Sequence, residues 1–425
     1  FGLFLLVQAS LPSKPDFEAK ISADLLRAMA EAQAAGKILH VWVNLRDKGR
    51  QGEAALQRAL AEARQTLRVR CERRRLKVRE ASNLVDYEDL PVSRSYTEQV
   101  RPLVSKVRAV SRWLNALSVE VSPDQLPALA GLEFVTSLDL VRSFKRGEDL
   151  ELEPEDEKKA PSLPSPIYGD AYAQLNQINV LPLHQQGLSG RGVLVCMLDV
   201  GFHKSHEVFR LAHLIAEWDF VFGDGDVERN SADQNDYSDS HGTATWSLLG
   251  GFKFGEMAGP AFGADFILAK TEDDRSETPI EEDYWVAGIE WGESLGADVV
   301  SSSLGYTDWY QFKDMDGKTA VTTKAANRAA SLGVVVVNAA GNERQNSWAH
   351  IIAPADGYNV IAVGAVDSSN KIASFSSPGP TYDGRIKPEV CALGVNNWIA
   401  QNRRDGSDFY TRCSGTSYAT PLVGG

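Results

Sequence analysis

Residues 192–199 read Gly-Val-Leu-Val-Cys-Met-Leu-Asp, an unbroken apolar run that ends in a carboxylate. Such a run, without alternation of polar and apolar residues, predicts a strand that is buried on both faces. Similar runs recur along the second half of the chain, with helical stretches between several of them. This alternation predicts an α/β fold with a doubly wound, mostly parallel sheet. Further strands are expected at 266–269, 299–302, 334–337 and 360–363, and helices at 281–295 and 319–332.

Polar residues stand where such a sheet presents its functional groups, at the carboxyl ends of its strands. Asp199 ends the first run, and His241 opens a helix of small residues after an acidic loop. Ser417 follows Gly415-Thr416 at a further predicted helix start, where the helix dipole favours negative charge. A serine becomes a nucleophile when a base such as histidine takes its proton, and a buried carboxylate orients that base. These three residues therefore predict nucleophilic catalysis.

A fourth polar residue, Asn342, ends a stretch that runs from Val334 through a strand into a turn of small residues. An amide group in this position can donate a hydrogen bond to negative charge that develops on a substrate oxygen. The sequence thus predicts an oxyanion donor as well as a nucleophile and a base.

Together these segments resemble the subtilisin-like serine proteases of the subtilase family. The order Asp, His, Ser along the chain is the order found in subtilisin. The resemblance covers about residues 175–425, and it is highly specific because four motifs occur in the expected order. They are Leu-Asp-Val-Gly at 198–201, His-Gly-Thr-Ala at 241–244, Ala-Ala-Gly-Asn at 339–342 and Gly-Thr-Ser-Tyr-Ala-Thr-Pro at 415–421, with 301–305 and 385–390 in support.

The resemblance implies a role for each matched residue. Ser417 would attack the peptide carbonyl, His241 would act first as base and then as acid, and Asp199 would orient His241. Asn342 and the backbone amide of Ser417 would form the oxyanion hole. The substrate backbone would pair with one segment as an added strand, and a second segment would line the opposite wall of the first specificity pocket. These two segments are Ser303, Leu304 and Gly305, and Ala339, Ala340 and Gly341.

Two residues depart from the family pattern. Val200 follows Asp199 where the family usually has Ser or Thr, so a hydroxyl near the carboxylate is lost. Tyr418 follows Ser417 where the family usually has Met. We expect both changes to affect rate or specificity without removing the catalytic residues.

A smaller α+β domain is expected over 16–146, before an acidic, Pro-rich linker at 147–170, while the catalytic domain would span 171–425. The resemblance implies that the smaller domain is a propeptide, which inhibits the site until a cut between 144 and 168, with Lys145-Arg146 as a candidate. An accessory domain that stays attached is the alternative. Strands are expected at 37–47, 118–122 and 134–141, and helices at 52–80, 96–117 and 123–132.

Charge is unevenly distributed along the chain, whose net charge is −13. Residues 1–150 hold 24 basic and 19 acidic side chains, and the remainder holds 20 and 38. A basic front half and an acidic back half can attract one another, although two independent solvated surfaces are the alternative. Arg73-Arg74-Arg75 on the helix at 52–80 is expected to lie on a solvated helix face, because an acidic chain argues against nucleic acid as a partner.

The first and last residues of the sequence predict a signal peptide at one end and a truncated domain at the other. Residues 1–10 (Phe-Gly-Leu-Phe-Leu-Leu-Val-Gln-Ala-Ser) resemble the end of a signal peptide, which predicts a secreted or otherwise exported protein, extracellular or periplasmic. An apolar N-terminal strand is the alternative. No later stretch has about 18 uninterrupted apolar residues, so no membrane span is expected. The sequence stops inside an expected helix at Gly425, which predicts a catalytic domain truncated at its C-terminus.

The sequence does not decide whether two of the cysteines form a disulfide or whether an acidic loop binds calcium. Cys391 and Cys413 lie near the expected site and either pair or remain free thiols, while Cys196 is expected to be a buried small hydrophobe. No cofactor is expected for the chemistry. Structural calcium is common in the family, and the acidic loop from Asp224 to Asp239 offers oxygen ligands, although a solvated loop is the favoured alternative.

The sequence therefore predicts a secreted serine endopeptidase that is made as a zymogen and acts on protein or peptide substrates through an acyl-enzyme. Two alternatives stay open. One, from another class, is a subtilase-fold binding or inhibitory protein without turnover, and the other is an aminopeptidase-like or processing enzyme of narrow specificity.

Overall fold

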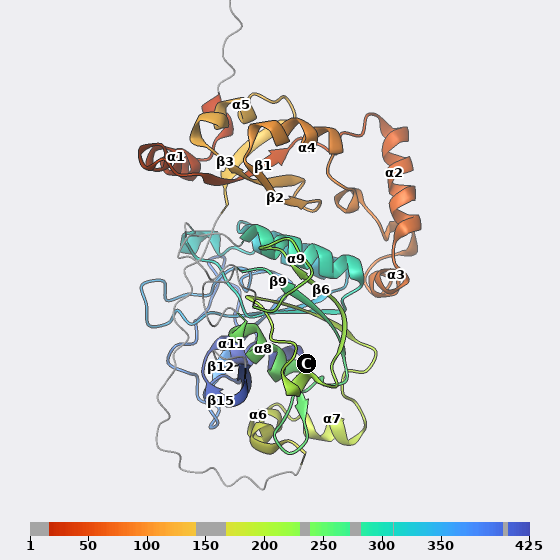
Figure 1. Ribbon diagram of the computed structural model, residues 1–425, viewed down its shortest axis with the longest axis vertical. Helices are drawn as coiled ribbons and strands as arrows, with labels where there is room; N and C mark the ends of the chain where they lie inside the picture. The colour runs from red at the N-terminus through yellow and green to blue at the C-terminus, as the bar shows by residue number, and fades with distance from the viewer. Residues whose placement is uncertain (1–16, 142–166, 230–238, 273–281, 309, 403–406) are drawn as a thin grey trace, which may run out of the picture. The chain divides into compact units, whose positions relative to one another are not determined.

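The computed structural model describes residues 17–141, 167–229, 239–272, 282–308, 310–402 and 407–425 (Figure 1). The chain divides into two compact units. The small unit comprises residues 1–50, 92–110 and 115–140, and the large unit comprises 51–91, 111–114 and 141–425. The expected signal remnant at 1–10, most of the expected linker, and the candidate cleavage site at 145–146 lie outside the described residues.

The small unit is built on a four-stranded sheet with the strand order β2-β3-β1-β4. The central strand, β1 (Leu39–Leu45), pairs antiparallel with β3 (Ala116–Val121) and with β4 (Val135–Leu140). Helix α1 (Ala23–Ala35) packs on this sheet through Leu25, Ala28 and Ala32. Its remaining elements are β2 (Lys106–Ser111), α4 (Arg94–Val100) and α5 (Leu126–Ala130).

The helix expected at 96–117 is wrong beyond Val100, where α4 ends and a 3-10 turn, Arg101–Leu103, follows. Pro102 has no backbone N–H to continue an α-helix. After it the chain forms the hairpin β2–β3, which turns at Asn115 with a left-handed φ of 51°. The β-branched Val107 and Val110 of β2 suit a strand better than the helix that the sequence favoured.

The large unit contains the predicted parallel sheet, with seven strands in the order β13-β12-β11-β10-β5-β9-β6. All of its recorded strand pairs are parallel, so the doubly wound architecture is confirmed. The strands are β5 (Leu194–Asp199), β6 (His213–Asp219), β9 (Asp265–Lys270), β10 (Val299–Ser302), β11 (Val335–Ala339), β12 (Val360–Val366) and β13 (Val390–Leu393).

Helices cover both faces of this sheet (Figure 1). Along β5, Val195 and Met197 belong to the core under α8 (Ser240–Gly250) and α11 (Thr416–Gly424). Cys196 and Leu198 face α9 (Glu282–Leu295), where a Cβ on Gly292 would lie 2.6 Å from Cys196 Sγ. Helix α10 (Val321–Ser331) packs beside α9. Burial on both sides explains why these strands read as continuous apolar runs.

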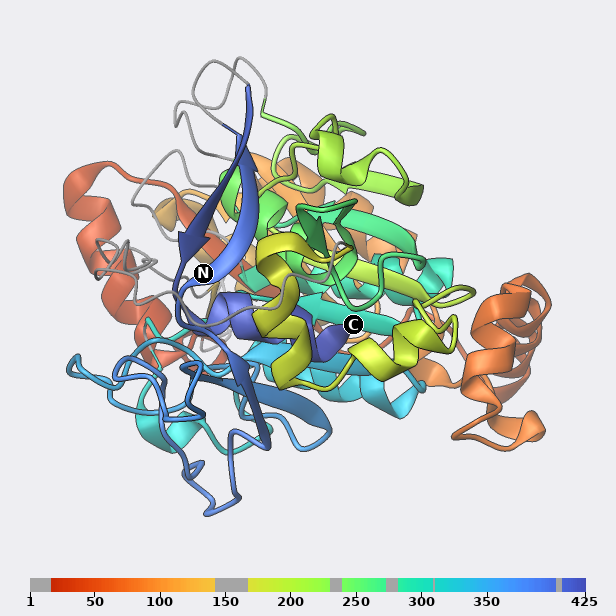
Figure 2. The same cartoon turned by 90° about the horizontal axis from the view of Figure 1, so that it is seen from below.

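The sequence missed strands at the edges of the fold. β6 and β13 form the two edges of the sheet: β6 mixes polar with apolar residues, and β13 has only four residues. Two antiparallel hairpins were also missed, and the longer one is the blue ribbon that extends from the body of the large unit in Figure 2. The hairpin strands are β7 (Phe252–Lys253), β8 (Met257–Ala258), β14 (Asn397–Asn402) and β15 (Asp408–Cys413). Two short helices, α6 (Tyr172–Gln177) and α7 (Leu181–Gln185), open the region after the linker.

The basic segment before the linker is part of the large unit. The single helix expected at 52–80 is two helices, α2 (Glu53–Thr66) and α3 (Val69–Arg75), separated by an extended Leu67-Arg68. The expected solvated face is wrong for Arg74 and Arg75, each of which is buried, whereas Arg73 is exposed. Burial of two guanidinium groups requires partners that the sequence spacing does not reveal.

Candidate active site

Three neighbouring parallel strands end together at one edge of the large sheet. Leu198 on β5, Ser302 on β10 and Asn338 on β11 are in register across the three strands. The residues that follow them therefore emerge side by side at the carboxyl edge, where such sheets place their functional groups. These following residues are Asp199, Ser303 and Ala339.

The Asp199 carboxylate and the His241 ring form a buried pair. His241 Nδ1 lies 2.6 Å from Asp199 Oδ1, and the two side chains are 4% and 1% exposed. Asp199 closes β5, while His241 lies in the first turn of α8. A carboxylate at this distance holds the proton on Nδ1 and leaves Nε2 as the basic nitrogen.

Two further groups hydrogen-bond the same carboxylate. The Val200 backbone N–H donates to Asp199 Oδ1 at 2.8 Å, and the Thr245 hydroxyl donates to Oδ2 at 2.9 Å. Thr245 thus supplies a hydroxyl that the departure at Val200 removes. Sequence reasoning missed this residue, although Thr245 stands four positions after His241 and hence on the same face of its helix.

Gly242 allows α8 to approach the end of β5. A Cβ at Gly242 would lie 1.9 Å from the Gly201 carbonyl oxygen and 3.1 Å from Asp199 Cβ. Any larger residue would force the helix away from the strand, which would lengthen the contact between His241 and Asp199. The His-Gly pair of the sequence motif therefore has a steric reason.

Ser417 lies in the first turn of α11 and is 6% exposed. Its hydroxyl donates to the Ser303 carbonyl oxygen at 3.2 Å, and the Ser303 hydroxyl donates to the Ser417 carbonyl oxygen at 2.8 Å. These two hydrogen bonds fix the start of α11 against the end of β10. Tyr418, buried beside it, has its ring centroid 5.9 Å from that of His241. The structure therefore brings Ser417 and His241 into the same part of the fold.

Asn342 adjoins the same helix start. Its Oδ1 accepts hydrogen bonds from the backbone N–H and the hydroxyl of Thr416, both at 2.9 Å. Its Nδ2 lies 3.5 Å from the position of a Cβ on Gly415. The two hydrogen bonds at Oδ1 therefore fix the Asn342 amide group beside the start of α11, with Nδ2 close to Gly415.

The two segments expected to bind substrate are joined to each other. Asn338 Nδ2 donates to the carbonyl oxygens of Leu304 at 2.9 Å and Ala339 at 3.1 Å. Residues 303–305 follow β10 and residues 339–341 end and follow β11, so they run along the same edge of the sheet. Gly341 has a left-handed φ of 104°, which favours glycine at this turn.

The cysteines do not form a pair. Cys391 is exposed, Cys413 is buried, and both are free thiols, as are Cys71 and Cys196. Burial raises the pKa of the Cys196 thiol, in keeping with the small hydrophobe predicted at that position.

The described parts of the acidic loop 224–239 do not gather into a calcium site. Asp226 Oδ1 accepts from Lys204 Nζ at 3.2 Å, and Asp239 Oδ1 accepts from Asn402 at 2.9 Å. Among the described residues no group of three or more His, Cys, Asp or Glu side chains is arranged to hold a metal ion. Residues 230–238 of this loop are outside the described part of the chain, so structural calcium stays a prediction.

Within the described ranges, no helix combines the length and the apolar character that a membrane span requires.

Two sequence families match different parts of the chain. The subtilase family matches residues 190–425, which include every residue of the candidate site. The propeptide domain of peptidase S8 proteins from Bacteroidota matches residues 40–158. The second match agrees with the resemblance of the front region to a propeptide.

Individual proteins similar to this chain are also subtilisins and related proteases. Subtilisin E of Bacillus subtilis (strain 168) is 33% identical over 256 residues, which are 59% of this chain and 58% of that protein. The serine protease AprX of the same species is 30% identical over 268 residues, 56% of this chain and 57% of AprX. The alkaline protease of Alkalihalobacillus alcalophilus is 30% identical over 310 residues, 73% of this chain and 67% of that protease. The chain thus spans between one half and two thirds of these relatives.

A solved structure shares the fold. Fervidolysin from Fervidobacterium pennivorans, a keratinolytic enzyme related to subtilisin, superposes with a TM-score of 0.60 at 21% identity. The superposition covers 92% of this chain and 54% of fervidolysin. The family match extends over more than half of the sequence and over the whole candidate site, and the chain therefore belongs to the subtilase family.

Proposed function

We propose that this chain is a serine endopeptidase that cleaves protein or peptide substrates through an acyl-enzyme on Ser417. The observation that carries the proposal is the buried 2.6 Å contact between His241 and Asp199, at the sheet edge to which Ser303 ties Ser417. A hydrogen-bonded histidine and carboxylate beside a serine at a helix start is an arrangement suited to acyl transfer.

In this mechanism His241 moves the proton. Its Nε2 takes the Ser417 proton as the hydroxyl oxygen attacks the carbonyl carbon, and it returns that proton to the leaving amine. Asp199 stays ionised and stabilises the imidazolium, and the hydroxyl of Thr245 holds the second carboxylate oxygen. Water then hydrolyses the acyl-enzyme, with His241 again acting as the base.

The negative charge of the tetrahedral intermediate would be stabilised by Asn342 Nδ2 and by the Ser417 backbone N–H. The first group is oriented by the two hydrogen bonds from Thr416. The second lies at the start of α11, where the helix dipole adds to the stabilisation. The substrate would pair with residues 303–305, with residues 339–341 on the opposite wall of the first specificity pocket.

We also propose that the enzyme is made as a zymogen whose propeptide inhibits the site until it is cut. The match of residues 40–158 to a propeptide domain supports this. Export from the cell is supported by the apolar stretch 1–10. Fractionation of the cells that make the protein tests export, because a protein found only in the cytoplasm would contradict it.

The proposed activity is tested with casein and three proteins: the wild type, Ser417→Ala, and Ser369→Ala in an exposed turn as a control. We expect Ser417→Ala to lose about 10⁶-fold in turnover, the size of the loss when the serine of subtilisin is removed. The control should keep its activity. On a gel, the wild type should be cut between residues 144 and 168, and Ser417→Ala should remain a single full-length band. Equal residual activity in all three proteins would overturn the mechanism.

A further inference from the structure

A helical segment that precedes the linker is buried against two helices of the large unit. It comprises residues 53–91, and we call it the arginine arm. Its helix α3 packs on α9, and three of its side chains are almost inaccessible: Cys71 is 0% exposed, and Arg74 and Arg75 are 1% exposed each. Fully buried arginines are rare unless every charge has a partner.

The arm supplies hydrogen-bond donors to the carboxyl ends of α9 and α10. The last carbonyl groups of a helix have no partner within it and carry partial negative charge. Arg74 donates from Nη1 to the Ala297 carbonyl at 2.7 Å and from Nε to the Leu332 carbonyl at 3.1 Å. The Cys71 thiol donates to the Glu293 carbonyl at 3.3 Å. Two further contacts of this kind are Arg70 Nε to Gly296 at 3.0 Å and Arg79 Nε to Ser331 at 3.1 Å.

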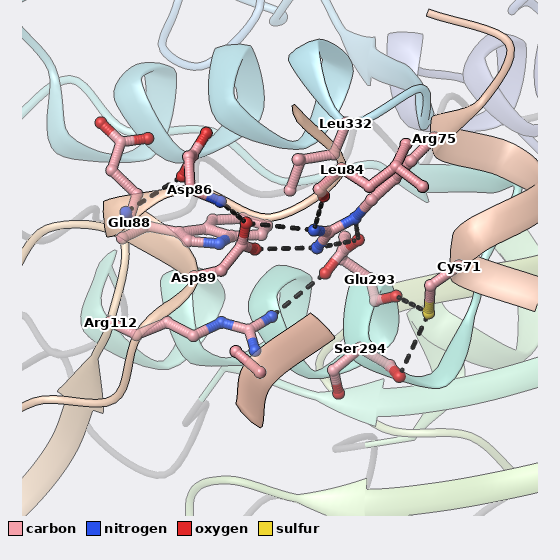
Figure 3. Close-up of polar contacts among 12 residues, drawn as sticks. Cys71, Arg75, Leu84, Asp86, Glu88, Asp89, Arg112, Glu293, Ser294 and Leu332 are labelled. Carbon is pink, nitrogen blue, oxygen red and sulfur yellow. Dashed lines mark hydrogen bonds and ion pairs between the residues drawn. The ribbon is translucent and has the colours of Figure 1, made fainter. Parts of the chain in front are cut away.

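The Glu293 carboxylate of α9 is the centre of the ion pairs (Figure 3). Its side chain is 1% exposed and is paired with Arg74. Arg75 Nη2 lies 2.9 Å from Oε1, and Arg112 Nη2 lies 3.1 Å from Oε2. Removal of this carboxylate would leave the buried Arg74 guanidinium without its carboxylate partner and take one of two from Arg75, which is strongly destabilising.

In other ion pairs the arginine belongs to α10 and the carboxylates belong to the arginine arm. Arg328 contacts both oxygens of Asp86, at 2.6 and 2.8 Å, and Asp89 Oδ2 at 3.2 Å. Asp89 in turn pairs with Arg75 at 2.8 Å. The arginine arm and the helices α9 and α10 thus each contribute both arginine and carboxylate side chains. The surface of α9 and α10 therefore fits this segment better than it would fit a basic helix without carboxylates.

From these contacts we propose that the arginine arm anchors the propeptide region to the catalytic unit after the linker is cut, and that Glu293 controls the rate of release. None of these contacts uses a residue of the linker, so a cut between 144 and 168 leaves them all in place. This proposal depends on the proposed function in one respect, which is that the linker is cut. The surface formed by Glu293 and the ends of α9 and α10 is therefore an anchoring site whose partner is residues 53–91.

The test measures how long the two pieces stay together. A recognition sequence for a site-specific protease is placed in the linker of the full-length chain, with Ser417→Ala to prevent self-digestion. After the cut, we expect the pieces to co-elute in size exclusion, with slow exchange of a fluorescently labelled N-terminal piece. Glu293→Gln should raise the rate of release by roughly 30-fold or more, because buried Arg74 loses its carboxylate partner and buried Arg75 keeps only Asp89.

A second variant keeps the test informative if Glu293→Gln does not fold. Arg70→Ala removes a partly exposed side chain that also pairs with Asp298, so folding should survive while release is several-fold faster. The control is Arg94→Ala, which removes an exposed pair with Glu98 on α4. Immediate separation of the cut wild-type pieces would overturn the proposal. Equal release rates for Arg70→Ala and Arg94→Ala would do so as well. Neither result depends on protease activity, so the proposed function stands or fails separately.

A different observation concerns the first specificity pocket. Ile352 is 4% exposed, and its Cδ1 lies 2.1 Å from the position of a Cβ on Gly305 and 3.0 Å from that of a Cβ on Gly341. Gly305 and Gly341 belong to the two walls described above. The isoleucine side chain therefore occupies the space that the two glycines leave open.

From this placement we infer that Ile352 restricts the substrate residue on the amino side of the cleaved bond to small side chains such as Ala, Ser or Gly. A substrate paired with residues 303–305 would direct that side chain into the gap between the walls. A bulky ring would overlap Ile352, and close-packed interiors do not yield space for it cheaply. The inference rests on the proposed function and names its substrate class.

The test uses matched peptide substrates that differ only in this residue. We expect kcat/KM for Ala to exceed that for Phe by at least about 30-fold in the wild type, from the cost of overpacking. Ile352→Gly should reverse the ratio, Ile352→Val should give an intermediate ratio, and Ile386→Gly, at a site 85% exposed, should leave it unchanged. Equal cleavage after Ala and Phe by the wild type would overturn the inference. If no peptide is cleaved, labelling of Ser417 by a fluorophosphonate shows whether the proposed function has failed.

Discussion

The catalytic role of Asp199 could be predicted from the sequence, whereas the partners of its carboxylate could be identified only in the folded chain. Its role was predictable because it directly follows a buried apolar run, as Ser417 and Asn342 are flagged by the glycines and small residues around them. Thr245 was not predictable as the donor to Asp199 Oδ2, because that contact depends on how α8 approaches β5. Ile352 was missed for the same reason, since only the folded chain brings it against Gly305 and Gly341.

Thr245→Val should lower kcat/KM by about tenfold, because one buried oxygen of Asp199 would lose its hydrogen bond. Thr245→Ser keeps the hydroxyl and should restore most of the activity. Steady-state kinetics on a peptide substrate measure the difference. Equal losses in the valine and serine variants would indicate that packing, and not the hydroxyl, matters at this position.

Asn342→Ala should reduce kcat by about 10²–10³-fold with little change in KM, the size of the effect known for the oxyanion donor of subtilisin. The reason is that Nδ2 acts only when the carbonyl oxygen becomes negative. Asn359→Ala, at an exposed position, serves as the matched control. A change confined to KM would place Asn342 in ground-state binding instead.

Whole elements were predictable where burial imposes a continuous apolar run. The strands β5, β9, β10, β11 and β12 were all expected from such runs, as were α9 and α10. The edge strands were missed because β6 mixes polar and apolar residues and β13 is only four residues long. The helix expected at 96–117 failed at Pro102, and the solvated face expected around Arg74 failed because its partners come from residues more than two hundred positions away.

A buried carboxylate between α10 and the segment before it makes a pH-dependent contribution. Burial raises the pKa of Asp356 to about 6, even though Thr323 and the Gly317 N–H donate to it. A raised pKa means that the folded state prefers the protonated acid. The free energy of unfolding should therefore fall as the pH rises from about 4 through about 6.

Asp356→Asn should remove this fall, since the amide cannot ionise. Relative to the variant, the wild type should lose roughly 3 kcal/mol between pH 4 and pH 7, from a shift of about two pKa units. Urea denaturation at several pH values, on a Ser417→Ala background that prevents autolysis, measures the difference. Parallel curves for the two proteins would show that Asp356 does not titrate in this range.

At the scale of the whole molecule, the uneven charge of the sequence has a partial structural explanation. The arginine arm belongs to the basic front half, and its arginines meet Glu293 on α9, which belongs to the acidic remainder. The chain's organisation into a propeptide-like region and a subtilase domain was predictable, because the two regions differ in composition and are separated by an acidic, Pro-rich stretch. The pairing of residues 51–91 with the large unit was not, since it follows from tertiary contacts.

Whether Ser417 is the nucleophile is tested most directly by covalent labelling of the processed protein with a fluorophosphonate, followed by mass spectrometry of the digested adduct. We expect one adduct, located on Ser417, and a loss of labelling in His241→Ala, because the base that activates the serine is gone. An adduct on another residue, or equal labelling of Ser417 without His241, would show that Ser417 is not a nucleophile activated by His241.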